Sequence, residues 1–169
     1  MRVFSLAAGL GSFLVGMMVF GNAVQAKELS SRLGIGYSNQ FGITQDLPSI
    51  AMRYYPNSDY GIGGAIGVDT TKDNSRFGLG AKIVKIVFRE DNMNFYTGAG
   101  AAIVSQESGG KTSSGFDLSG IAGAEFFLPG LESLSFSFEA GVGVTSLSSD
   151  VRFRTIGDSP LRAGIIFYF

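Results

Sequence analysis

The sequence contains no cysteine, histidine or tryptophan among its 169 residues, and it has only four prolines. Without cysteine there are no disulfides or thiolate nucleophiles, and without histidine the commonest general base and the usual zinc ligands are lost. Charged residues are also scarce, at 16% of the chain. The net charge is −1, and no segment has a cluster of basic residues. Most hydrolase chemistries and a nucleic-acid-binding surface are therefore excluded, and we expect no cofactor.

The composition is instead rich in glycine and phenylalanine. The chain has 25 Gly and 15 Phe, and 45% of its residues are hydrophobic. This composition excludes a disordered or collagen-like chain, and the length suits one domain.

The first segment predicts a targeting signal. Met1 and Arg2 give a short positive start, residues 3–21 are uncharged, and residues 23–26 (Ala-Val-Gln-Ala) resemble a signal-peptidase site. We interpret residues 1–26 as a cleaved secretory signal and residues 27–169 as the mature domain. A retained membrane helix is the alternative, since the run approaches the roughly 18 residues that span a bilayer. Secretion without cysteine suggests a bacterial envelope protein.

Beyond Ala26 the sequence alternates with a period of two residues. The clearest case is residues 134–144, where apolar residues alternate with Ser, Glu and Gly. Charges interrupt every run long enough for a membrane helix, so any span there must be a strand. The period predicts eight strands, at residues 33–37, 50–54, 60–68, 77–83, 95–103, 116–126, 134–144 and 161–169.

The predicted connections alternate in length. Long polar loops are expected at residues 39–46, 70–75, 106–114 and 145–160, and compact turns at 56–59, 89–92 and 129–133. This asymmetry is typical of an outer-membrane barrel with both chain ends in the periplasm. A soluble lipocalin-type barrel is the alternative, but it would place the apolar rows in a lumen that they would overfill. The membrane barrel predicts an outward aromatic girdle of Tyr54, Tyr60, Phe95, Phe126, Phe136 and Phe169.

Five strands carry a Gly-x-Gly pair. None has the third glycine of a phosphate-binding loop, so we interpret these glycines as small inward residues of a narrow lumen. The pairs are Gly34/Gly36, Gly61/Gly63, Gly78/Gly80, Gly98/Gly100 and Gly141/Gly143. The alternation breaks at Lys85, which would face lipid, and we expect a β-bulge that turns it inward.

The last strand, residues 161–169 (LRAGIIFYF), ends the chain on an aromatic residue. With residues 123–128 (GAEFFL), it resembles the small eight-stranded bacterial outer-membrane β-barrel proteins, the group containing OmpX and the OmpA membrane domain. The resemblance covers the mature chain and implies insertion by the outer-membrane assembly machinery, with Phe167 and Phe169 in the assembly signal. No peptidoglycan-binding domain follows the barrel, so cell-wall tethering is not implied.

The inward charges form the candidate site. We expect two stacked ionic layers, with Lys82, Glu139 and Arg162 at one height and Arg53 and Glu125 below them. A paired-carboxylate active site of the glycosidase type is one interpretation. A salt-bridged plug is the favoured one, because the lumen is too narrow for a sugar and three cations can keep both carboxylates ionised.

Weaker candidates lie nearer the loops. Asp69 and Asp117 are inward residues close to the loop ends. Arg152 and Arg154 flank Phe153 and could contact lipopolysaccharide phosphates, or simply be solvated. Phe41 and Ile43 could grip a partner or pack on the rim, and residues 112–115 read as a flexible connector.

These features together predict a non-enzymatic integral β-barrel of the bacterial outer membrane. It would contribute to envelope integrity or to surface contact through its loops, with a lumen plugged by salt bridges. Its expected partners are outer-membrane lipid, lipopolysaccharide and the assembly machinery, and the sequence does not identify a surface partner. One alternative is a lipid-modifying enzyme, which the absence of histidine disfavours. Another is a small diffusion pore, which needs an open lumen.

Overall fold

The computed structural model describes residues 28–39, 46–147, 150–155 and 161–169. The proposed signal segment and the Phe41 and Ile43 pair lie outside these ranges. Among the described residues, no helix is long and apolar enough to cross a membrane. The strands are β1 (Leu33–Ser38), β2 (Ser49–Tyr54), β3 (Tyr60–Asp69), β4 (Arg76–Glu90), β5 (Met93–Ser108), β6 (Lys111–Leu128), β7 (Leu131–Leu147), β8 (Asp150–Thr155) and β9 (Arg162–Tyr168).

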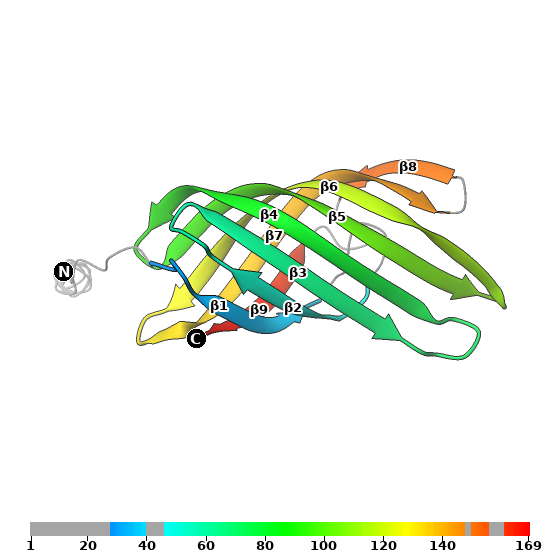
Figure 1. The fold of residues 1–169 in the computed structure, drawn as a ribbon, viewed down its shortest axis with the longest axis horizontal. Coiled ribbons are helices and arrows are strands. Elements are labelled where there is room, and N and C mark those ends of the chain that lie inside the picture. The colour runs from blue at the N-terminus through cyan, green and yellow to red at the C-terminus, as the bar shows by residue number, and fades with distance from the viewer. Residues whose placement is uncertain (1–27, 40–45, 148–149, 156–160) are drawn as a thin grey trace, which may run out of the picture.

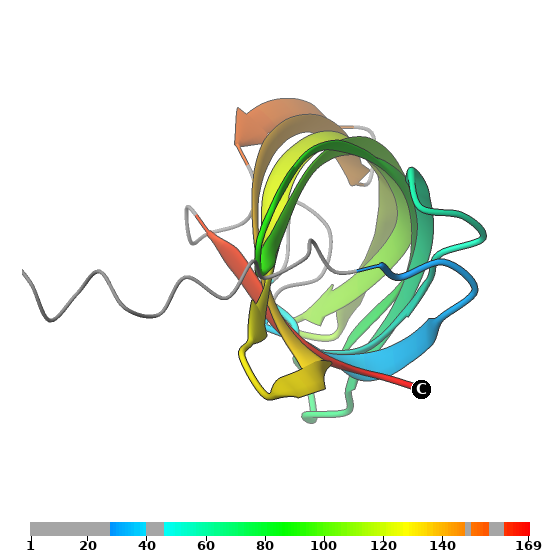
Figure 2. The same ribbon diagram turned by 90° about the vertical axis from the view of Figure 1, so that its left-hand side faces the viewer.

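Eight of these strands close into an antiparallel barrel, which confirms the predicted eight-stranded antiparallel architecture (Figures 1 and 2). Neighbours in the chain pair from β1 to β7, and β9 lies between β7 and β1 to complete the ring. The amide of Phe169 donates to the carbonyl of Leu33 at 3.0 Å, so the C-terminus lies beside the start of β1. We call this end, which also carries the β2–β3, β4–β5 and β6–β7 turns, the turn end, and the opposite end the loop end.

The predicted loop at residues 145–160 is wrong in part, because it contains β8. β8 pairs with the upper part of β7, from Val142 to Leu147, whereas β9 pairs with the lower part, from Leu134 to Glu139. The two strands therefore follow one another along the same edge of β7. Val151, Phe153 and Thr155 alternate with charged residues in a strand pattern, and the unpaired edge of β7 gives them hydrogen-bond partners.

The predicted loop at residues 106–114 is also wrong. β5 continues to Ser108 and β6 begins at Lys111, with a tight turn at Gly109 and Gly110. Both glycines have positive φ, +57° and +76°, as a two-residue type I′ hairpin requires. Residues 112–115, expected as a connector, pair with residues 104–107. Ladder hydrogen bonds between long strands override a composition that by itself favours a flexible segment.

Polarity is inverted relative to a soluble protein. The large hydrophobic side chains that are exposed far outnumber those that are buried, and they point outward from every barrel strand. The buried polar residues include Arg53, Glu125, Ser137 and Glu139, all on the lumen side. Tyr54, Tyr60, Phe95 and Phe169 are 37–62% exposed at the turn end, and Phe126 and Phe136 are half-buried there.

The predicted inward turn of Lys85 is wrong. A register irregularity does occur in β4, but between Ile86 and Phe88, and Lys85 stays exposed on the outer face. Val84 takes the lumen position with 1% exposure. It packs where Gly61 and Gly98 leave room, since a methyl group on either glycine would lie within 3.0 Å of the Val84 side chain. Packing in the lumen therefore preserves the inward–outward alternation of β4 through Lys85.

Candidate functional site in the barrel lumen

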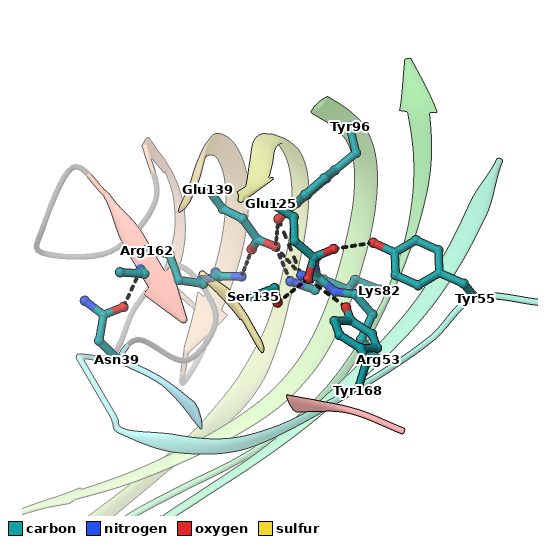
Figure 3. A network of polar contacts seen from close by, with 11 residues as sticks. Asn39, Arg53, Tyr55, Lys82, Tyr96, Glu125, Ser135, Glu139, Arg162 and Tyr168 are labelled. Carbon is teal, nitrogen blue, oxygen red and sulfur yellow. Dashed lines mark hydrogen bonds and ion pairs between the residues drawn. The ribbon is translucent and has the colours of Figure 1, made fainter. Parts of the chain in front are cut away.

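Glu139 on β7 is the centre of the larger ion-pair cluster (Figure 3). Arg53 Nη2 lies 3.0 Å from its Oε1, Arg162 Nη1 lies 3.2 Å from its Oε2, and Lys82 Nζ also donates to Oε1. Tyr96 Oη donates to the same Oε1 at 2.8 Å. The carboxylate is 2% exposed, so these contacts replace its hydration.

Glu125 on β6 is bound mainly by hydroxyl groups. Tyr168 and Ser135 each donate to its Oε1 at 2.7 Å, and Tyr55 donates to its Oε2 at 2.8 Å. Arg53 Nη1 lies 3.4 Å from Oε2 and is the cation of this lower group. Glu125 is fully buried at 0% exposure, and four side chains from β2, β7, β9 or their ends share its two oxygens.

The structure brings together all five predicted charged residues, but it joins the two expected layers into one network. Arg53 is the link, because one nitrogen faces Glu139 and the other faces Glu125. Its guanidinium also lies over the ring of Tyr96, 5.1 Å from the centroid. Arg53 therefore belongs to both layers and not to the lower one alone.

Sequence reasoning missed the three inward tyrosines, Tyr55, Tyr96 and Tyr168. Each fills space above a glycine on a neighbouring strand: a methyl group on Gly61, Gly123 or Gly34 would lie 2.8–2.9 Å from Tyr55, Tyr96 or Tyr168, respectively. The two-residue alternation could have identified them, since each tyrosine occupies an inward position whereas the neighbouring aromatic residues point outward. The glycines thus make room for the rings as well as narrowing the barrel.

Apolar side chains pack inside the barrel on both sides of the charged network. At the turn end, Leu29 enters the barrel and forms a cluster with the inward aromatic and aliphatic residues, among them Phe127 and Ile166. The segment before β1 is held there by hydrogen bonds from Ser31 N to Tyr55 O (2.7 Å) and from Tyr55 N to Arg32 O (3.1 Å). Towards the loop end, Leu47 is 1% exposed and packs on Val104.

A small cavity lies within the lumen. Its volume is about 70 Å³, room for only a few water molecules. Gly and Ala residues make up about half of its lining, which also includes the charged residues Arg53, Lys82, Asp117, Glu139 and Arg162. So small a volume disfavours the binding of a sugar or a lipid chain. Both carboxylates are also fully engaged, which favours the structural plug over a paired-carboxylate active site.

The remaining candidates lie outside this network. Asp69 ends β3 at the loop end and pairs with Arg76 at 2.7 Å, and Asp117 is buried in the lumen wall. Arg152 and Arg154 lie on the opposite face of β8 from Phe153, because their partners on β7 are Thr145 and Gly143, which face inward. Phe167 and Phe169 point outward, 54% and 62% exposed. Within the described ranges, no group of three or more acidic side chains could hold a metal ion.

Comparison with known proteins finds no match: no protein-family model, no curated protein and no solved structure is similar to this chain. The resemblance to the OmpX and OmpA group therefore stays a prediction from the sequence.

Proposed function

We propose that this protein is a non-enzymatic integral β-barrel of the bacterial outer membrane. The observation that carries the proposal is the inverted polarity of a closed barrel, with apolar side chains around the outer wall and charged and hydroxyl groups inside. In water, barrels with an apolar outer surface all the way round would aggregate. In a bilayer the same surface contacts lipid chains. A closed sheet also leaves no unpaired backbone edge in the hydrocarbon region.

The lumen supports a structural role. The Glu139 and Glu125 contacts cross-link β2, β4, β5, β6, β7 and β9 through the barrel interior. Apolar clusters lie on either side of this network, and this packing supports a filled lumen over a substrate path or a water-filled pore. The barrel would therefore serve as a rigid support, contributing to envelope integrity or holding its loop-end hairpins for surface contact.

Assembly and lipid partners follow from this placement. Phe167 and Phe169 on the outer face of the last strand would form the signal read by the outer-membrane assembly machinery. Lipopolysaccharide remains a proposed partner, but Arg152 and Arg154 lie on the inner face of β8. Because these side chains face inward, a lipopolysaccharide phosphate could reach them only over the rim at the loop end and not from the lipid-facing side.

One outward substitution separates a membrane barrel from a soluble one. Phe138 lies in the middle of β7 and is 45% exposed. In a bilayer, Phe138→Lys should destabilise the folded barrel by about 2–4 kcal/mol, while the same change at Leu131, beside the β6–β7 turn, should cost about 0–1 kcal/mol. In a soluble barrel both positions would face water, and both substitutions would have small effects.

The measurement is unfolding of the purified protein refolded in lipid vesicles, together with its recovery from separated inner and outer membranes. Equal stability of the two variants, or recovery of the wild type in the soluble fraction, would overturn the proposal. Release of labelled acyl chains from lipid A would favour the enzyme instead, and stable conductance steps in a planar bilayer would favour the pore.

A further inference from the structure

Between Phe77 and Phe88, the outer wall of β4 has one charged side chain among apolar ones. Phe77, Leu79, Ala81 and Ile83 precede Lys85 on this face, and Val87 follows it. Ile83 and Val87 are 60% and 57% exposed, so Lys85 emerges from an apolar surface. If this face contacts lipid, the ammonium group must reach a polar partner within the length of its own side chain.

Two further hydrogen-bond donors share its row. Lys85 is the direct cross-strand partner of Tyr60 on β3 and of Thr97 on β5. Direct cross-strand partners lie on the same face of a sheet, and both residues are exposed on the outer wall. An ammonium, a phenol and a hydroxyl thus stand side by side on three adjacent strands.

Among the residues that the structure describes, Lys85 has no counter-ion. Its Nζ lies 5.9 Å from the centre of the Tyr60 ring, a cation–π contact at the limit of the useful distance. In the part of the chain that the structure describes, no carboxylate lies within ion-pair distance of this amine. The nearby Asp59 pairs with Arg89 instead, at 3.1 Å.

We propose that Lys85, Tyr60 and Thr97 form a binding site for the phosphate of an anionic phospholipid in the leaflet at the turn end. Tyr60 directly follows the β2–β3 turn, which places the row near the membrane–water interface, where lipid phosphates lie. A phosphate oxygen accepts from ammonium and hydroxyl donors at once, and it supplies the negative charge that Lys85 lacks. The inference rests on the proposed membrane location.

The test measures lipid binding by native mass spectrometry of the folded protein in detergent micelles. Phosphatidylglycerol and phosphatidylcholine are titrated separately at low ionic strength. The wild type should bind phosphatidylglycerol more tightly, and Lys85→Met should reduce that affinity about fivefold, the effect of one cation near an anionic lipid surface. Lys85→Arg should retain the preference for phosphatidylglycerol. Tyr60→Phe should reduce the affinity less than Lys85→Met does, because it keeps the aromatic ring.

Lys72→Met is the matched control, since it removes the same charge from the β3–β4 connection at the opposite end of the barrel. It should leave phosphatidylglycerol binding unchanged. Equal affinity of wild type and Lys85→Met, or equal losses in Lys85→Met and Lys72→Met, would overturn the site. Insertion into vesicles is scored separately: a barrel that inserts but shows no Lys85-dependent preference refutes this site alone, whereas failure to insert refutes the membrane location.

Discussion

Replacing Glu139 by glutamine should be the most costly isosteric change in the lumen. The substitution keeps the size of the side chain but removes the negative charge that Arg53, Lys82 and Arg162 share. Arg53 retains Glu125 at 3.4 Å, whereas Lys82 and Arg162 lose their common carboxylate. Breaking a buried ion pair costs about 3–5 kcal/mol, and we expect the lower part of that range because cavity water can solvate the Lys82 amine.

Ser137→Ala is the matched control. Ser137 lies two residues before Glu139 on the same inward face and is 6% exposed. It should cost less than about 1 kcal/mol, because it removes a neutral hydroxyl and leaves every ion pair in place. The assay is equilibrium urea unfolding of both variants and the wild type in detergent micelles, with midpoints compared at equal slope.

The double variant Lys82→Met/Glu139→Gln tests whether the cost is one of charge. Removing one cation with the carboxylate should restore part of the lost stability, so the two single effects should not add. Equal midpoints for Glu139→Gln and Ser137→Ala would refute the reasoning, and additive effects would show that Lys82 and Glu139 do not interact.

Three further predictions concern processing, assembly and packing. The protein recovered from the outer membrane should begin at Lys27, as N-terminal sequencing can show; an intact Met1 in the inner membrane would contradict the signal assignment. Deleting Phe169 should slow insertion, measured as the fraction of heat-modifiable protein on gels, and wild-type levels would count against an assembly role. Gly61→Ala should destabilise the barrel by about 1–3 kcal/mol, since its methyl group would lie 2.8 Å from the Tyr55 ring, while Gly120→Ala, with nothing within 4 Å, should be nearly neutral in the same urea assay.

The sequence by itself determined which residues face in and which face out. Strand side chains alternate with a period of two, so residues 134–144 specify both faces of β7 without reference to any other strand. The same local rule placed Arg53, Lys82, Glu125, Glu139 and Arg162 inside the barrel. It also predicted the positions of the eight barrel strands, because each contains a stretch with the same two-residue alternation.

Only the tertiary structure decided which inward residues meet. Arg53 reaches both carboxylates because barrel closure brings β2 opposite β6 and β7, a relation set by the register of all the intervening strands. Tyr55, Tyr96 and Tyr168 enter the network because glycines on neighbouring strands leave space for their rings. No local pattern carries that information.

The wrong predictions have the same origin. The extension of β5 and β6 beyond the expected loop, and the pairing of β8 with β7, depend on a neighbouring strand that supplies hydrogen bonds to polar sequence. Lys85 stays outward because Val84 packs between Gly61 and Gly98 on two other strands. Alternation along one strand is a local property. Strand length, register and the direction in which a residue such as Lys85 points depend on contacts between strands that only the closed barrel brings together.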